Sequence, residues 1–243
     1  MIDTILFDLD GTLAQFSQQA FINAYFAEIG KVFTGLGMDA TMSIKAVWVG
    51  TKSMIENDGS RLNIHRFWEA FTDTMGISYE QGKKVEEACD SFYQNEFDVV
   101  KSILQPSEIP KRLIRNLSLK GYITVLATNP LFPDYGIKTR LNWIGLKMSD
   151  FLLVTHYNNS SYCKPNLSYY REVLSKISKS PHQCIMVGNN PAEDMIAGEI
   201  GMDTFLVTDY LENETGMDIS EYRYGTLDEL ERVLMALPDN PVS

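Results

Sequence analysis

The chain has 243 residues, of which 44% are hydrophobic and 22% charged, a composition typical of a globular protein with a sizeable core. Its formal net charge of −11 argues against a basic surface, so we expect no nucleic-acid partner. No segment has the length and apolarity of a membrane span, and the three cysteines lack Cys-x-x-Cys spacing. With no secretory signal before the first strand, we expect a cytoplasmic protein with no membrane partner and no disulfides.

The first predicted element is a strand at residues 4–8, which ends in two acids one residue apart. Asp8 and Asp10 follow a short apolar run, and Gly11 and Thr12 come directly after them. Carboxylates at the exit of a buried strand are costly unless a metal ion or a reacting group uses them. Because the glycine permits a tight turn, we expect both acids to lie in a cleft at the carboxyl edge of a sheet.

Residues 14–105 show helical periodicity almost throughout. Apolar residues recur at the spacing of one helix face in residues 22–33 and 64–75, and further stripes cover residues 44–55 and 85–92. Each apolar stripe needs a partner to pack against. We therefore expect these helices to form a small bundle.

After residue 105, short β-rich runs alternate with helical stripes. We expect strands at residues 122–128, 151–154, 184–188 and 204–207, and helices near residues 110–121, 167–177, 191–200 and 226–234. Such alternation predicts a parallel sheet covered by helices on both faces, with at least five strands. The expected fold class is α/β, a doubly wound, mostly parallel, Rossmann-like sheet, with residues 1–13 and 106–243 as the core and residues 14–105 as an inserted all-helical domain.

Three later strand exits carry polar residues of the kinds that phosphoryl transfer needs. They are Thr128-Asn129, Lys164-Pro165 and the segment GNNPAED at residues 188–194. Together with DLDGTL at residues 8–13, and in the same order, they resemble the four signatures of the haloacid dehalogenase-like hydrolase superfamily. The resemblance covers most of the core and is to the phosphatase branch with a helical C1-type cap, similar to phosphoglycolate phosphatase.

The resemblance implies a Mg²⁺-dependent phosphatase that hydrolyses a small phosphorylated metabolite. Asp8 would form an aspartyl phosphate, and Asp10 would act as general acid and base. Lys164 would be the third catalytic residue, because its charge offsets the repulsion between Asp8 and the phosphate. The implied phosphate-binding residues are Thr128, Asn129 and Lys164, and the implied metal-binding residues are Asp8, Asp10, Asp194 and Asn189.

Two positions depart from the pattern of the superfamily. Asn189 stands where the fourth signature usually has an aspartate, and Cys163 where a glycine commonly precedes the lysine. We hypothesise that Asn189 weakens Mg²⁺ binding, because one negative charge is missing. Two alternatives stay open: a phosphomutase or phosphotransferase of the same superfamily, which needs the same residues, and, because of Asn189, a degenerate, non-catalytic binding protein.

Other interpretations have less support. Haloalkanoate dehalogenation has no use for a second acid, so Asp10 argues against it. A signalling receiver domain lacks a large cap, so the long helical insertion argues against that class. Within the insertion, polar residues between two expected helices are candidates to face the site: Asn57, Asp58 and Arg61.

Overall fold

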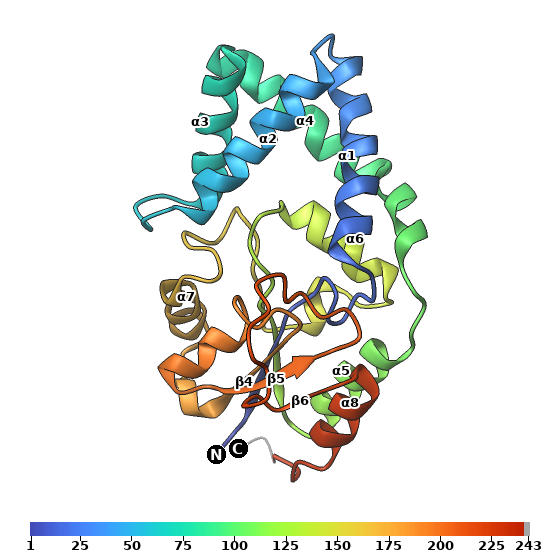
Figure 1. Cartoon of the computed structure of the whole chain (residues 1–243), viewed down its shortest axis with the longest axis vertical. Helices are drawn as coiled ribbons and strands as arrows, with labels where there is room; N and C mark the ends of the chain where they lie inside the picture. The colour runs from blue at the N-terminus through green and yellow to red at the C-terminus, as the bar shows by residue number, and fades with distance from the viewer. Residues whose placement is uncertain (241–243) are drawn as a thin grey trace.

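The computed structural model describes residues 1–240 and contains one six-stranded sheet (Figure 1). The strand order is β3-β2-β1-β4-β5-β6, and every neighbouring pair is parallel. The strands are β1 (Thr4–Phe7), β2 (Ile123–Leu126), β3 (Leu153–Val154), β4 (Cys184–Gly188), β5 (Asp203–Val207) and β6 (Tyr224–Gly225). The predicted α/β class is confirmed, and the two-residue strand β6 is an addition that the sequence pattern does not predict.

Strand β1 lies in the middle of the sheet, between β2 and β4, and all four of its residues are fully buried. Its side chains alternate between the two faces. Ile5 and Phe7 belong to the core cluster that includes residues of α5 and α8, whereas Leu6 packs with residues of α7. The bounds of these helices are α5 (Ile109–Leu119), α7 (Leu167–Ile177) and α8 (Leu227–Met235). Helices therefore cover both faces, which leaves the carboxyl edge of the sheet for polar side chains.

Four helices between β1 and β2 form a layer of their own beyond that edge (Figure 1). They are α1 (Gln18–Gly35), α2 (Ala40–Ile55), α3 (Asn63–Met75) and α4 (Tyr79–Asn95), followed by the 3₁₀ helix η1 (Phe97–Ile103). The predicted helical stripes pack against one another, as where the rings of Phe33 and Phe71 stack at 5.9 Å. Gly50 allows α2 to approach α3, because a Cβ there would lie 2.7 Å from the Phe67 ring. None of the described helices combines the length and the apolarity needed to cross a membrane.

Two segments differ from the sequence-based expectation. Helix α6 (Asp134–Trp143) occupies a stretch for which no helix is predicted, because its buried stripe includes a charged residue, Arg140, beside Ile137 and Leu141. The segment 191–200 is not a single helix but a turn followed by the 3₁₀ helix η4 (Met195–Ile200). The side chain of Asn190 accepts hydrogen bonds from the main-chain N–H groups of the next turn, which holds that turn in place.

Candidate active site

Three of the predicted site residues meet at the carboxyl edge of the sheet. Asp8 directly follows β1, and its main-chain N–H donates to Val187 at 2.8 Å, which continues the pairing with β4. The Nζ of Lys164 lies 2.9 Å from Oδ1 of Asp8 and 2.6 Å from Oδ1 of Asp194. The lysine side chain is 1% exposed, so a buried cation lies between two buried carboxylates.

The electrostatics of this group follow from its burial. Burial raises the pKa of Asp8 to about 7, because the lowering effect of Lys164 is partly offset by the neighbouring carboxylate of Asp194. Burial on its own would lower the pKa of Lys164, but the carboxylates of Asp194 and Asp8 raise it well above its usual value. The lysine therefore stays charged, and it compensates only part of the negative charge around it.

Two glycines make this close packing possible. Gly11 has a φ of +76°, a conformation that favours glycine, and its N–H donates to Ala14 at 2.8 Å to close the turn after β1. A Cβ on Gly11 would overlap the side-chain amide of Asn189. A Cβ on Gly188 would overlap the carboxyl group of Asp194. The glycines of the first and fourth motifs are thus needed to bring these acids and the amide to one edge.

Thr128 and Asn129 both line the cleft, but they differ in whether their side-chain polar atoms already have hydrogen-bond partners. The hydroxyl of Thr128 makes no hydrogen bond to the described residues, while its carbonyl is held by Thr155 at 2.7 Å and by Tyr169 at 2.9 Å. The side chain of Asn129 is engaged: Nδ2 donates to Glu193 at 3.0 Å, and Oδ1 accepts from the N–H of Lys164 at 3.2 Å. Thr128 can therefore donate to a ligand, whereas the Asn129 side chain braces the loops around it.

Asp10 pairs with an arginine that the sequence analysis did not identify. Its Oδ2 accepts from Nη1 of Arg140 on α6, and the guanidinium lies 4.3 Å from the ring centroid of Phe132 and 5.3 Å from that of Phe21. Burial raises the pKa of Asp10, and the charges of Arg140 and Lys164 act against that shift. Oδ1 of Asp10 and Nη2 of Arg140 are both buried without a partner among the described residues.

The side chain of Asn189 joins two loops at the site. Oδ1 accepts from the hydroxyl of Thr12 at 3.1 Å, and Nδ2 donates to the carbonyl of Tyr210 at 2.7 Å. The main-chain carbonyl of Asn189 also accepts from the N–H of Glu212 at 2.9 Å, which brings that acid beside the site. Asn189 is therefore placed at the site as predicted, but its amide is used for structure at both ends.

Two further acids, Glu193 and Glu212, line the cleft, and neither is among the site residues that the resemblance implies. Burial raises the pKa of Glu193 to about 7, and burial with the nearby Asp8 raises that of Glu212 to about 8. Glu193 lies within the fourth motif and was detectable there. Glu212 lies in an irregular loop after β5, where no sequence pattern marks it.

The oxygen atoms at the carboxyl edge of the sheet are suitable ligands for a hard cation. The carboxylates of Asp8 and Asp194 are oxygen ligands of the kind that Mg²⁺ prefers, and the main-chain oxygen of Asp10 accepts no hydrogen bond from the described residues. The excess of acids around Lys164 also calls for a second positive charge. Among the described residues, however, no three His, Cys, Asp or Glu side chains converge as a preformed metal site, and Lys164 is bonded to one oxygen of each acid.

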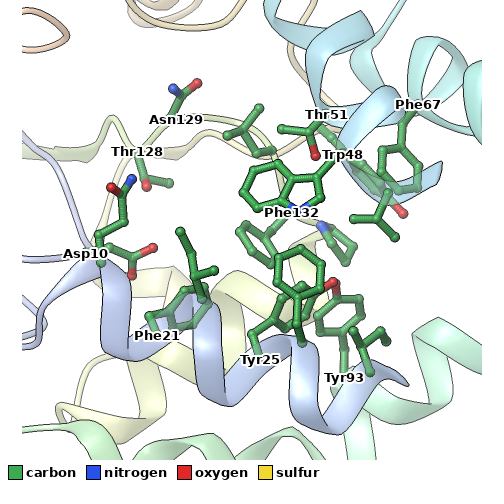
Figure 2. Close-up of a pocket in the computed structure, with 18 of the residues that line it drawn as sticks. Asp10, Phe21, Tyr25, Trp48, Thr51, Phe67, Tyr93, Thr128, Asn129 and Phe132 are labelled. Carbon is green, nitrogen blue, oxygen red and sulfur yellow. The ribbon is translucent and has the colours of Figure 1, made fainter. Parts of the chain in front are cut away.

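A cavity of about 210 Å³ runs from these acids into the helical layer (Figure 2). Asp10, Thr128 and Asn129 lie at one end, and the aromatic rings of Tyr25 and Phe67, from α1 and α3, lie at the other. The polar residues Asn57, Asp58 and Arg61 do not line this cavity, so the expectation that they face the site is wrong. Asn57 instead bonds to the Arg61 carbonyl at 2.9 Å within its own loop.

The fold is similar to that of several solved structures. A HAD phosphatase from Thermococcus onnurineus aligns with a TM-score of 0.60 and 17% identity over 98% of this chain and 100% of that one. A 2-haloacid dehalogenase from Pseudomonas syringae pv. Tomato DC3000 aligns with a TM-score of 0.61 and 18% identity over 97% and 99%. A β-phosphoglucomutase from Clostridium difficile aligns with a TM-score of 0.58 and 16% identity over 95% and 93%. At these identities the likeness shows the fold alone, and the three proteins differ in activity.

The family follows from the sequence. No curated protein matches the chain. A family model described as haloacid dehalogenase-like hydrolase matches residues 2–200, which include all four motifs at the strand ends. The chain therefore belongs to the haloacid dehalogenase-like hydrolases.

Proposed function

We propose that the chain is a Mg²⁺-dependent phosphomonoesterase that uses Asp8 as its nucleophile. The observation that carries the proposal is the placement of Asp8 at the base of the cavity, 2.9 Å from the buried ammonium of Lys164 and beside a second acid, Asp10. The helices of residues 14–105 act as the cap over this cavity. They exclude water from the reacting groups, which strengthens each charge interaction there.

In the first step, the carboxylate oxygen of Asp8 that is not bonded to Lys164 attacks phosphorus. The new O–P bond forms as the bond from phosphorus to the leaving oxygen breaks, and Asp10 gives its proton to that oxygen. The hydroxyl of Thr128 donates to a phosphoryl oxygen, and Lys164 reduces the repulsion between the two anions. Burial favours the neutral form of Asp10 that this step needs.

In the second step, water attacks the aspartyl phosphate and restores Asp8. Asp10, now ionised, takes a proton from that water as its oxygen bonds to phosphorus, and phosphate leaves. The adjacent guanidinium of Arg140 favours the ionised form of Asp10 between the two steps. Burial and Arg140 thus act in opposite directions on one carboxyl group, as expected for a group that first gives and then accepts a proton.

The cation would be held by the carboxylates of Asp8 and Asp194 and by the main-chain oxygen of Asp10. The side-chain oxygen of Asn189 accepts one hydrogen bond from Thr12, and its second lone pair would be available to the cation. Mg²⁺ there would supply positive charge to the phosphoryl oxygens. The residues around it provide the rest of the site: a nucleophile, a proton donor and a fixed cation.

The proposal is tested by turnover and by isotope labelling. Acetyl phosphate and p-nitrophenyl phosphate, assayed with Mg²⁺, should be hydrolysed by the wild type and not by Asp8→Asn. Asp3→Asn is the matched control, because Asp3 lies at the opposite, amino end of the same strand. A turnover in H₂¹⁸O should place ¹⁸O in the released phosphate and none in the carboxyl group of Asp8, detected by mass spectrometry of the phosphate and of the peptide.

The same experiment separates the alternatives. Transfer of the phosphoryl group to an added sugar phosphate, with no release of ¹⁸O-labelled phosphate, would identify a phosphotransferase. Release of halide from a haloacid with no phosphate turnover would identify a dehalogenase. Absence of all these reactions in a protein that still binds Mg²⁺ would favour the non-catalytic binding protein.

A further inference from the structure

We propose that the substrate carries an apolar leaving group, a single ring or a branched hydrocarbon of similar size, and not a sugar, a nucleoside or an organic acid. The proposal rests on the phosphomonoesterase function above and names its substrate class. The observations that carry it are the chemistry, the charge and the size of the cavity beyond the phosphoryl end.

Aromatic side chains dominate that part of the cavity. Of its 29 lining residues, 12 are Phe, Tyr or Trp. Both layers of the molecule contribute: Phe21, Tyr25 and Trp48 come from the cap helices α1 and α2, and Phe132 from the core (Figure 2). Rings on opposite walls favour an apolar guest, and especially a flat one that can stack or meet a ring edge.

The polar side chains on these walls are few, and those of Gln18 and Thr51 make no hydrogen bond to the described residues. The hydroxyls of Tyr25 and Tyr93 share a hydrogen bond of 2.6 Å, which leaves little capacity for a ligand. The indole Nε1 of Trp68 is buried without a hydrogen bond of normal geometry, although it approaches the hydroxyl of Tyr157. Beyond the phosphoryl end the walls offer few free polar side chains, so several hydroxyls of a sugar would lose water without gaining partners.

No basic side chain lines the cavity to pair with a second anion on the substrate. All five charged residues that line it are acidic: Asp8, Asp10, Glu193, Asp194 and Glu212. The nearest cation, Lys164, is committed to two carboxylates, and Arg140 is paired with Asp10. The carboxylate of a phosphorylated acid such as phosphoglycolate would therefore find no counter-charge.

The volume of the cavity favours a small guest. A cavity of about 150 Å³ lined by apolar side chains holds a benzene molecule. The volume here is about 210 Å³ and must also admit the phosphoryl group. One ring and its link to the phosphate therefore fit within this volume, whereas a ribose and a base together exceed it.

The test compares esters whose leaving groups are all primary alcohols, so that leaving-group acidity does not decide the result. The panel is 2-phenylethyl phosphate, ethyl phosphate, glycerol 1-phosphate, glucose 6-phosphate, phosphoglycolate and uridine 5′-monophosphate. We expect kcat/KM for 2-phenylethyl phosphate to exceed that for each polar ester by about 100-fold or more. The unreactive 2-phenylethylphosphonate should also bind more tightly than phosphonoacetate, measured by calorimetry.

A pair of variants on one helix tests the pocket itself. Trp48 lines the cavity, whereas its neighbour Val49 does not, and their exposed fractions of 48% and 39% make both tolerant of truncation. Trp48→Ala should lower the preference for 2-phenylethyl over ethyl phosphate by about 10-fold. Val49→Ala should leave that ratio within about two-fold of the wild type.

The outcomes distinguish this inference from the function on which it rests. Hydrolysis of acetyl phosphate together with a preference for a polar ester would overturn the apolar substrate and keep the phosphomonoesterase. A phosphatase that prefers 2-phenylethyl phosphate equally in Trp48→Ala would also overturn the assignment of this cavity. No turnover of any ester, but selective binding of 2-phenylethylphosphonate, would refute the phosphomonoesterase and support the apolar pocket.

Discussion

Arg140 places a full positive charge in the interior, and its removal should be measurable as a loss of stability. The side chain is 1% exposed, pairs with Asp10, and donates from Nε to the carbonyl of Gly136 at 3.2 Å. Its guanidinium also lies over the ring of Phe132 at 4.3 Å. Arg140→Met keeps the apolar stem beside this ring and removes the charge, so it isolates the electrostatic contribution.

The size of the effect follows from these contacts. Removing one partner of a buried ion pair costs about 3–5 kcal/mol, and a cation over an aromatic ring contributes about 0.5–2 kcal/mol. Asp10 recovers part of this loss by taking up a proton, because burial already raises its pKa. We therefore expect a net loss of about 3 kcal/mol in the free energy of unfolding, which corresponds to a fall in Tm of about 6–12 °C for a chain of this length.

The assay is thermal unfolding of the wild type, Arg140→Met, Asp10→Asn and the double variant. The double variant should be more stable than Arg140→Met, because no carboxylate is then left without a partner. A Tm of Arg140→Met within about 2 °C of the wild type, or a double variant no more stable than Arg140→Met, would refute the reasoning. In kinetics, Arg140→Met should move the pH dependence of kcat/KM that Asp10 sets to higher pH, and Arg140→Lys should restore part of the shift.

Two further substitutions test the charges of the cap and of the metal edge. Burial, with the nearby Glu86 and Asp134, raises the pKa of Asp90 to about 6. Between about pH 4 and pH 6 the folded state therefore keeps a proton that the unfolded chain has lost. The free energy of unfolding falls as pH rises through this range. Asp90→Asn should therefore stabilise the protein by about 1 kcal/mol at pH 7.5, after allowance for solvent screening, and not at pH 3.5; urea unfolding with no gain at pH 7.5 would contradict this. Asn189→Asp should bind Mg²⁺ more tightly in calorimetry, and equal or weaker affinity would disprove the charge argument. The same substitution should lower the free energy of unfolding by about 1–3 kcal/mol, because the carbonyl of Tyr210 loses its hydrogen-bond donor.

The predictable part of this fold is the part encoded by local patterns. Helical stripes and β-rich runs locate most elements, and the parallel arrangement then brings Asp8, Lys164 and Asp194 together, because strands of one direction end at one edge. Arg140 is not predicted from the sequence, because a buried charged residue interrupts the apolar stripe that would indicate its helix. Its partner Asp10 is identified, but nothing in the spacing of the two residues indicates that they meet.

The lining of the cavity shows a second limit of sequence reasoning. Aromatic residues of the cap stripes, such as Tyr25 and Phe67, are predicted only as packing residues. Whether such a ring faces its own bundle or an open cavity depends on how the bundle sits on the sheet, which no local pattern encodes. Glu212 is missed for a different reason, because it lies in a loop after β5 that has no periodic pattern.

The central position of β1 has a consequence for how the protein forms in the cell. Thr4 is paired with Ile123 on one side and with Cys184 on the other, although the ribosome makes β1 before either partner. The apolar strand that precedes the nucleophile therefore stays unpaired while the cap and most of the core are synthesised. Contacts between residues this far apart in the sequence slow folding and prolong the lifetime of aggregation-prone intermediates. The order of synthesis thus delays assembly of the reactive edge until β4 has left the ribosome.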